Sequence, residues 1–302
     1  SDIYSPYLPA AKQGETAHRY VLGLYHIMDE LTTRFPEILF EGCSSGGNRF
    51  DLGILSYFPQ IWASDNTDAL CRTGIQNSYS YGYPLSVFTA HVSSCPNHQT
   101  LRITPLETRF QVASFGILGY ECNLKDLSGS DLNAIREQIA FYKKWRDVFQ
   151  FGSFYRGAEN EASDSETLSW TCVSPDGRRA VGLFFRRLTV PNQSHDWYRP
   201  VGLLPDVKYH FYGRNIKYNL KDFGDLVNTV SPVHIKQGSA LQEILSRFVN
   251  MDGEKEDLTA YGDTLMRAGI ALKPAFAGTG YNSDTRLFPD FSSRIYFMEA
   301  VE

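Results

Sequence analysis

Two long segments of the first half repeat their apolar residues every three or four positions, which predicts helices over residues 14–35 and 128–149. The first helix is expected to end before Pro36, because the residue preceding a proline disfavours helical backbone. The second opens on Ser128, with Asp131 three residues later in the manner of a capping box. The expected buried stripes are Tyr20, Val21, Leu24, Ile27, Met28 and Leu31 on the first helix, and Leu132, Ile135, Ile139 and Tyr142 on the second.

Short apolar runs lie between these two helices, and each is followed by polar or glycine-rich residues and another helical pattern. They cover residues 38–41, 60–64, 85–91 and 119–122. Strands alternating with helices are typical of βα units. Four such units in succession predict an α/β region that is half of an eightfold (β/α)8 barrel.

After about Gly157 the pattern changes to short β-type runs separated by Pro, Gly, Asn and Asp. The runs cover residues 167–174, 179–187, 208–212, 270–272 and 293–298. Ser174-Pro175-Asp176-Gly177 predicts a hairpin turn, since proline sets φ and glycine supplies a positive φ. We therefore expect two domains, a half barrel over residues 1–157 and an antiparallel β-sandwich over 158–302, with the boundary near the acidic segment 158–166.

Composition excludes several classes of function. The net charge is −5 and the charged residues are interspersed, so neither nucleic acid nor a membrane surface is expected as a partner. The five cysteines are odd in number and form no CxxC pair, which argues against a disulfide framework or a zinc ribbon and favours the reducing cytoplasm. The first residues do not resemble a signal peptide, and no apolar stretch approaches the roughly 18 residues of a membrane-spanning helix.

Barrel enzymes carry their reactive groups at the carboxyl ends of the strands, so the residues after each apolar run are the candidates for chemistry. The first run ends in a loop of small residues, Cys43-Ser44-Ser45-Gly46-Gly47. Small residues let backbone approach a ligand closely, and successive N–H groups can bind an anion or a hydroxyl. A tight βα turn without any function accounts for the same residues and is the better interpretation of the loop alone.

The second run ends in Trp62-Ala63-Ser64-Asp65-Asn66-Thr67-Asp68. A protonated carboxyl can act as an acid on a glycosidic oxygen, and an aromatic face can cover a sugar ring. Alternatively, an aspartate here caps the following helix, and Asp68 is the better candidate for that role. Residue types alone leave both possibilities open for Asp65.

The third run ends at His91, and His98 follows seven residues later. This spacing does not match a helical metal pair, so hydrogen-bonded structural histidines are the favoured interpretation and no metal site is expected. Cys43 with His91 as its base would make a thiol hydrolase, the least favoured alternative.

Several long motifs occur in an order that resembles the bacterial and fungal α-galactosidases of glycoside hydrolase family 36, the melibiase type. They are SPYLPAAKQGETAHRYVLGLY, LFEGCSSGGNRFDLGILSYFPQIWASDNTDAL, AHVSSCPNHQT, TPLETRFQVASFGILGYE and IAFYKKWRDVFQFGSFYR. The resemblance implies that residues 1–157 are the carboxy-terminal half of the barrel. It further implies that Asp65 is the general acid/base and that Cys43, Ser45 and Gly46 line a galactose pocket that Trp62 helps to shape.

The nucleophile of that family is an aspartate in a K-W-D-x-N-R motif, which is not among these 302 residues. The resemblance implies retaining hydrolysis of terminal α-galactosides such as melibiose and raffinose, without metal or organic cofactor, in a protein that is often a homo-oligomer. These residues alone are expected to lack normal activity, because a retaining glycosidase needs two carboxyl groups. A noncatalytic carbohydrate-binding or assembly role, and galactosyl transfer of the raffinose synthase type, are the alternatives.

Overall fold

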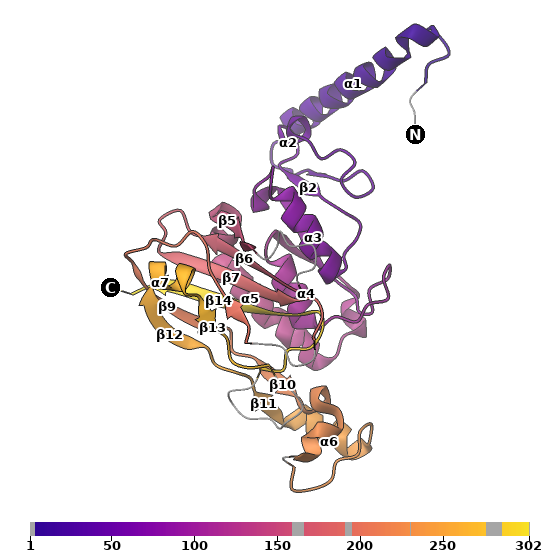
Figure 1. Ribbon diagram of the computed structural model, residues 1–302. Coiled ribbons are helices and arrows are strands. Elements are labelled where there is room, and N and C mark those ends of the chain that lie inside the picture. The colour runs from indigo at the N-terminus through magenta and orange to yellow at the C-terminus, as the bar shows by residue number, and fades with distance from the viewer. Residues whose placement is uncertain (1–3, 159–165, 191–194, 230, 276–285, 302) are drawn as a thin grey trace.

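A computed structural model describes residues 4–158, 166–190, 195–229, 231–275 and 286–301. The first region of the chain contains a small parallel sheet. The sheet order is β1-β2-β3-β4, with all neighbours parallel (Figure 1). Its strands are β1 (Glu41–Gly42), β2 (Gln60–Trp62), β3 (Phe88–Ser93) and β4 (Ile117–Glu121).

Four predicted strands are therefore present, but the first is much shorter than expected. Residues 38–40 are not in a strand, and the side chains of Ile38 and Leu39 are 54% and 68% exposed. The chain turns after Pro36 and reaches the edge of the sheet only at Glu41, where just two residues pair with β2.

Helices and short 3-10 turns precede, connect and follow these strands. Both predicted long helices are confirmed, and Ser128 forms the predicted capping box with Asp131. The helical elements are η1 (Ala10–Lys12), α1 (Gln13–Arg34), α2 (Leu52–Leu55), α3 (Ala69–Tyr79), η2 (Leu85–Val87), α4 (Leu106–Ala113), η3 (Leu124–Asp126) and α5 (Gly129–Phe151).

A six-stranded antiparallel sheet dominates the second region. Its order is β12-β9-β14-β7-β6-β5, so β14, the last strand in the sequence, lies in the middle (Figure 1). The strands are β5 (Ser153–Arg156), β6 (Thr167–Val173), β7 (Arg179–Arg186), β9 (Lys208–Gly213), β12 (Asp257–Tyr261) and β14 (Ser292–Ala300). The runs predicted at 167–174, 179–187, 208–212 and 293–298 are thus confirmed as strands.

The predicted hairpin turn joins β6 to β7. Gly177 has a φ of 70°, and its N–H donates to the carbonyl of Ser174 over 2.8 Å. Much of the expected boundary segment, residues 159–165, lies outside the described residues. The six-stranded sheet already includes β5, which precedes that segment.

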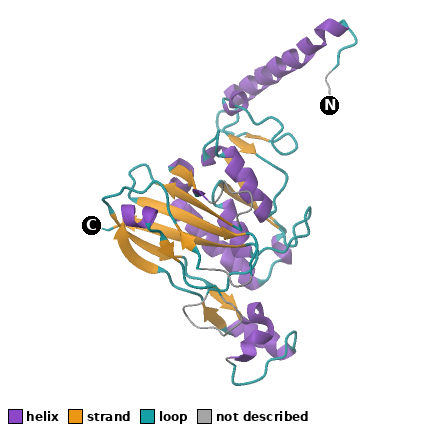
Figure 2. Ribbon diagram, viewed as in Figure 1, coloured by secondary structure: helices purple, strands orange, loops and turns teal. Residues whose placement is uncertain are grey.

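Smaller elements complete the second region. β8 (Trp197–Tyr198) pairs with β13 (Ile270–Ala271), within the run predicted at 270–272. β10 (Lys217–Asn219) pairs with β11 (Asn250–Asp252) beside η5 (Leu220–Thr229) and α6 (Ala240–Phe248), which extend away from the large sheet (Figure 2). α7 (Gly262–Arg267) follows β12.

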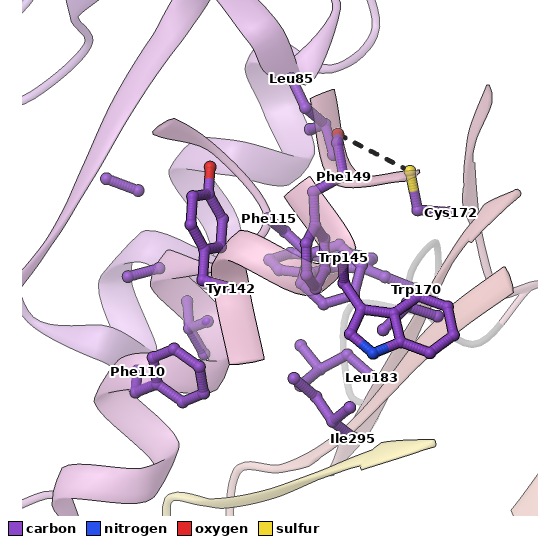
Figure 3. Packing of buried hydrophobic residues seen from close by; sticks show 14 of the residues in the cluster. Leu85, Phe110, Phe115, Tyr142, Trp145, Phe149, Trp170, Cys172, Leu183 and Ile295 are labelled. Carbon is purple, nitrogen blue, oxygen red and sulfur yellow. Dashed lines mark hydrogen bonds between the residues drawn. The ribbon is translucent and has the colours of Figure 1, made fainter. Parts of the chain in front are cut away.

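The main hydrophobic core joins the two regions. Helix α4 contacts β3 and β4 of the parallel sheet and β14 of the antiparallel sheet, and helix α5 contacts η2, β6 and β7. Figure 3 shows Phe115, Trp145, Phe149 and Trp170 together in this core. A sheet of one region is therefore held to a sheet of the other by shared side chains.

Helix α1 departs from the prediction of a packed helix. It projects away from the rest of the chain (Figure 1), and Met28 is its one buried residue. Met28 packs with Ile54 and Ile61, whereas Tyr20 and Ile27 are 45% and 57% exposed. Leu24 is half-buried against the same cluster, so only the end of the stripe near β2 is partly packed. Within the described part of the chain, no helix combines the length and the apolar character that crossing a membrane requires.

Candidate active site

The loop after β1 has an unusual backbone. Ser44, Ser45, Gly46 and Gly47 have φ values of 114°, 54°, 73° and 91°. Left-handed backbone is uncommon for residues with a side chain, so Ser44 and Ser45 are the unusual members of this run, whereas Gly46 and Gly47 adopt it readily.

The loop after β2 lies directly against the two glycines. A Cβ added at Gly46 would stand 2.6 Å from the backbone nitrogen of Asp65, and one at Gly47 would stand 2.5 Å from the carbonyl oxygen of Ala63. Only glycine allows this approach. The structure therefore brings together the two segments that the sequence singled out separately.

Asp65 is exposed, and the Trp62 indole holds one of its oxygens. Trp62 Nε1 donates to Asp65 Oδ1 over 2.9 Å. The indole itself is 9% exposed and stacks on the His91 ring at a centroid distance of 4.4 Å. A carboxylate that is open to solvent yet fixed by a buried donor is well placed to exchange a proton with a ligand.

Asp68 is the capping residue, as the alternative for this motif anticipated. It is 2% exposed, and its Oδ1 accepts from the N–H of Cys71 in the first turn of α3. Its other oxygen accepts from Thr100 and lies 2.7 Å from Arg102. Burial acts to raise the pKa of Asp68, but the hydrogen bonds from Thr100, Cys71 and Arg102 outweigh it and lower the pKa.

The sequence missed Arg72, which is buried behind the site. It donates to the carbonyls of Ser64 and Thr89, and its guanidinium carbon lies 5.0 Å from the Trp62 ring centroid. Burial lowers the pKa of Arg72 to about 10, so it stays cationic at neutral pH. A signal existed, because the polar residues Arg72, Thr73 and Gln76 follow Ala69 at helical spacing on the buried face of α3.

The two histidines have different environments. His91 Nδ1 lies 3.1 Å from Glu121 Oε2, in agreement with a hydrogen-bonded structural role, and its partner is Glu121 rather than Cys43. His98 is exposed. The described residues contain no group of three or more His, Cys, Asp or Glu side chains that could hold a metal ion.

Two family models match the chain. The model described as Melibiase matches residues 1–152, and the one described as Glycosyl hydrolase family 36 C-terminal domain matches residues 167–298.

Similar curated proteins are α-galactosidases. Alpha-galactosidase 1 of Pediococcus pentosaceus is 48% identical over 209 residues, which are 69% of this chain and 28% of that protein. AgaA of Geobacillus stearothermophilus is 45% identical over 216 residues, 72% of this chain and 29% of that protein. The chain thus spans less than a third of the length of the curated relatives it matches.

Solved structures agree with these relatives. An α-galactosidase from Lactobacillus brevis has a TM-score of 0.77 at 35% identity, over 100% of this chain and 34% of that one. A double variant of AgaA in complex with raffinose has a TM-score of 0.75 at 36% identity, with the same coverage. Another double variant of AgaA, in complex with stachyose, has a TM-score of 0.74 at 37% identity, again with the same coverage.

Proposed function

Because this chain belongs to the melibiase family of glycoside hydrolases, we propose that it carries the general acid/base part of a retaining α-galactosidase site. The observation that carries the proposal is the exposed Asp65 carboxylate, which the Trp62 N–H fixes and the glycine loop after β1 abuts. In this proposal Asp65 is the acid/base, and Asp68, buried as a helix cap, takes no part in the chemistry.

Asp65 acts twice in the proposed mechanism. In its acid form it gives a proton to the glycosidic oxygen as the bond to the anomeric carbon breaks, and as a carboxylate it then takes a proton from the attacking water. The nucleophile is a second carboxylate about 5 to 5.5 Å away. The family motif that supplies it is not among these 302 residues, so we infer that they lack normal turnover alone.

The proposed substrate is a terminal non-reducing α-D-galactosyl residue, as in melibiose and raffinose. The complexes of AgaA variants with raffinose and stachyose support this class. Cys43, Ser45 and Gly46 are the proposed galactose-binding residues, since their loop borders the Asp65 backbone. Trp62 shapes the pocket from behind Asp65. The chemistry needs carboxyl groups and water, and we propose no metal or organic cofactor.

Release of nitrophenol from nitrophenyl α-galactoside tests the function. We expect activity from a longer protein that includes the K-W-D-x-N-R family motif. Its Asp65→Asn variant should lose kcat by about 100-fold or more, because the attack of water in the second step still needs the Asp65 carboxylate as a base. Asp29→Asn, an exposed aspartate on α1, is the matched control and should retain full activity. Turnover by the 302 residues alone, dependent on Asp65, would show that a nucleophile lies within them and contradict this account.

Product analysis separates hydrolysis from the alternatives. With raffinose as donor, free galactose indicates hydrolysis, and a new galactosylated sugar indicates transfer of the raffinose synthase type. Galactose binding without any turnover in the longer protein would favour a noncatalytic carbohydrate-binding role instead.

We also propose the finer architecture. Residues 1–157 correspond to the carboxy-terminal half of a (β/α)8 barrel, and residues 158–302 to an antiparallel β-sandwich domain that shares a core with it.

The exposed apolar stripe of α1, with Tyr20, Val21 and Ile27 each more than 40% exposed, favours association between copies of the chain. Light scattering tests this, and a monomer at micromolar concentration would contradict it.

A further inference from the structure

The Trp62 indole, which donates to Asp65, also contacts His91, and His91 in turn contacts Glu121. Both belong to the parallel sheet, His91 on β3 and Glu121 near the end of β4. The imidazole stacks on the indole at 4.4 Å with an interplanar angle of 30°, and its Nδ1 lies 3.1 Å from the carboxylate. The proposed mechanism leaves both side chains without a role.

The backbone of β4 leaves space for the His91 imidazole because residue 119 is a glycine. Gly119 of β4 pairs with His91 across the sheet, and a Cβ at Gly119 would lie 2.5 Å from His91 Cδ2 and 2.7 Å from Nε2. Glycine within a strand weakens it and often marks a place where another group approaches closely. The ring therefore lies directly over the β4 backbone, where Glu121 holds one edge.

Because His91 holds the indole in place, the indole N–H points in a fixed direction toward Asp65. Trp62 is almost fully buried, with His91 stacked on it and Arg72 at 5.0 Å from its ring centroid. Its N–H consequently has one direction, and Asp65 Oδ1 accepts from it. An oxygen that accepts this bond is disfavoured as the bearer of the acidic proton, so the proton belongs on Oδ2.

We propose that His91, held by Glu121 and seated over Gly119, is a positioning residue for proton delivery, because it orients the Trp62 indole so that Asp65 donates from Oδ2. This rests on the proposed acid/base role of Asp65. The Oδ2–H bond breaks as the glycosidic oxygen gains the proton and keeps the electron pair of its bond to the anomeric carbon. The indole N–H then stabilises the charge left on the carboxylate.

The contact can be tested on the 302-residue chain by nuclear magnetic resonance. Four tryptophans give at most four indole N–H signals, and Trp62→Phe identifies the relevant one. We expect Asp65→Ala and His91→Ala each to speed hydrogen exchange of the Trp62 N–H at least tenfold at pH 7. His91→Phe, which keeps an aromatic ring over Gly119, should restore most of the protection.

His98→Ala is the matched control, because His98 is an exposed histidine on the loop after β3, and it should leave the signal unchanged. Faster exchange in His98→Ala equal to that in His91→Ala, or unchanged exchange in His91→Ala, would overturn the proposal.

The catalytic consequence can be tested in the longer protein through the leaving group. Melibiose needs protonation of its leaving oxygen, whereas nitrophenolate leaves almost unaided. We expect His91→Ala to lower kcat at least tenfold for melibiose and less than threefold for the nitrophenyl galactoside. Equal losses for both substrates would indicate a structural role and overturn the proposal. Absence of any α-galactosidase activity in the unmodified longer protein would instead overturn the proposed function, and with it proton delivery, while the exchange result would still decide the contact.

Discussion

Helices α1 and α5 have similar lengths and comparable apolar stripes but opposite surroundings. α1 has 22 residues and buries one of them, Met28, while α5 has 23 and buries six. The α5 stripe meets β6 and β7, and Trp145 stacks on Phe297 of β14 at 5.1 Å. Periodicity thus defines which face of a helix can be buried, whereas the opposing surface decides whether it is.

The largest effect should come from truncating the centre of the α5 face. Trp145 is 2% exposed, so Trp145→Ala should lower the free energy of unfolding by about 3 to 5 kcal/mol through lost burial and a cavity. Urea denaturation followed by circular dichroism measures this. Tyr20→Ala on α1 is the control, with an expected change within about 0.5 kcal/mol. Equal losses would mean that α1 is as tightly packed as α5.

Helix α3 extends the comparison, because its N-cap residue, Asp68, is buried. Asp68→Ala should cost about 2 kcal/mol, since the helix loses its cap and Arg102 loses its carboxylate. The folded-state pKa of Asp68 is lowered, so its charge contributes stability above the ordinary value of 3.8, and that contribution is lost as pH falls through the folded pKa.

Urea unfolding at pH 7 and at pH 3 checks the Asp68 prediction. The difference between wild type and variant should narrow at the lower pH, and a constant difference would assign the effect to packing alone. Asp29→Ala, exposed on α1, should behave like wild type at both values.

A smaller effect is expected at the start of α5. Ser128 Oγ accepts from the N–H of Asp131, and Ser128→Ala should cost about 1 kcal/mol. Lys12, at the corresponding position of α1, makes no side-chain cap, so Lys12→Ala should be neutral. Thermal unfolding of both variants tests this, and a loss in Lys12→Ala matching that in Ser128→Ala would count against it.

The smallest effect on stability is expected on the outer face of α1. Ile27 is 57% exposed, and Ile27→Ser should change the free energy of unfolding by less than about 0.5 kcal/mol. If copies of the chain associate through this stripe, the same change should lower the apparent mass in light scattering. A destabilisation of 2 kcal/mol or more would show that α1 packs within its own chain.

Local signals predicted most of the elements. The capping box at Ser128, the turn at Gly177 and the runs that became β6, β7, β9 and β14 depend on neighbouring residues, so the sequence alone revealed them. The exposure of α1 and the shortening of β1 depend on which surfaces lie opposite, and no local pattern contains that information.

The candidate site divides in the same way. The glycine loop and the Asp65 motif were visible as residue types at the ends of two apolar runs, and Asp68 was the better candidate for a helix cap. Their direct contact through Gly46, and the chain of contacts Glu121–His91–Trp62–Asp65, join residues from strands β2, β3 and β4 and from the loops after β1 and β2. Such contacts follow from strand order and register, which periodicity does not define.

The central place of β14 has a consequence for how the polypeptide acquires its shape during synthesis. Strands β5, β6 and β7 form one group and β9 with β12 another, and β14 alone bridges them. A ribosome makes this strand more than 100 residues after β6 and β7. The edges of β7 and β9 that pair with β14 therefore stay unpaired until residue 300 has left the ribosome. We expect the nascent chain to depend most on chaperones during this interval.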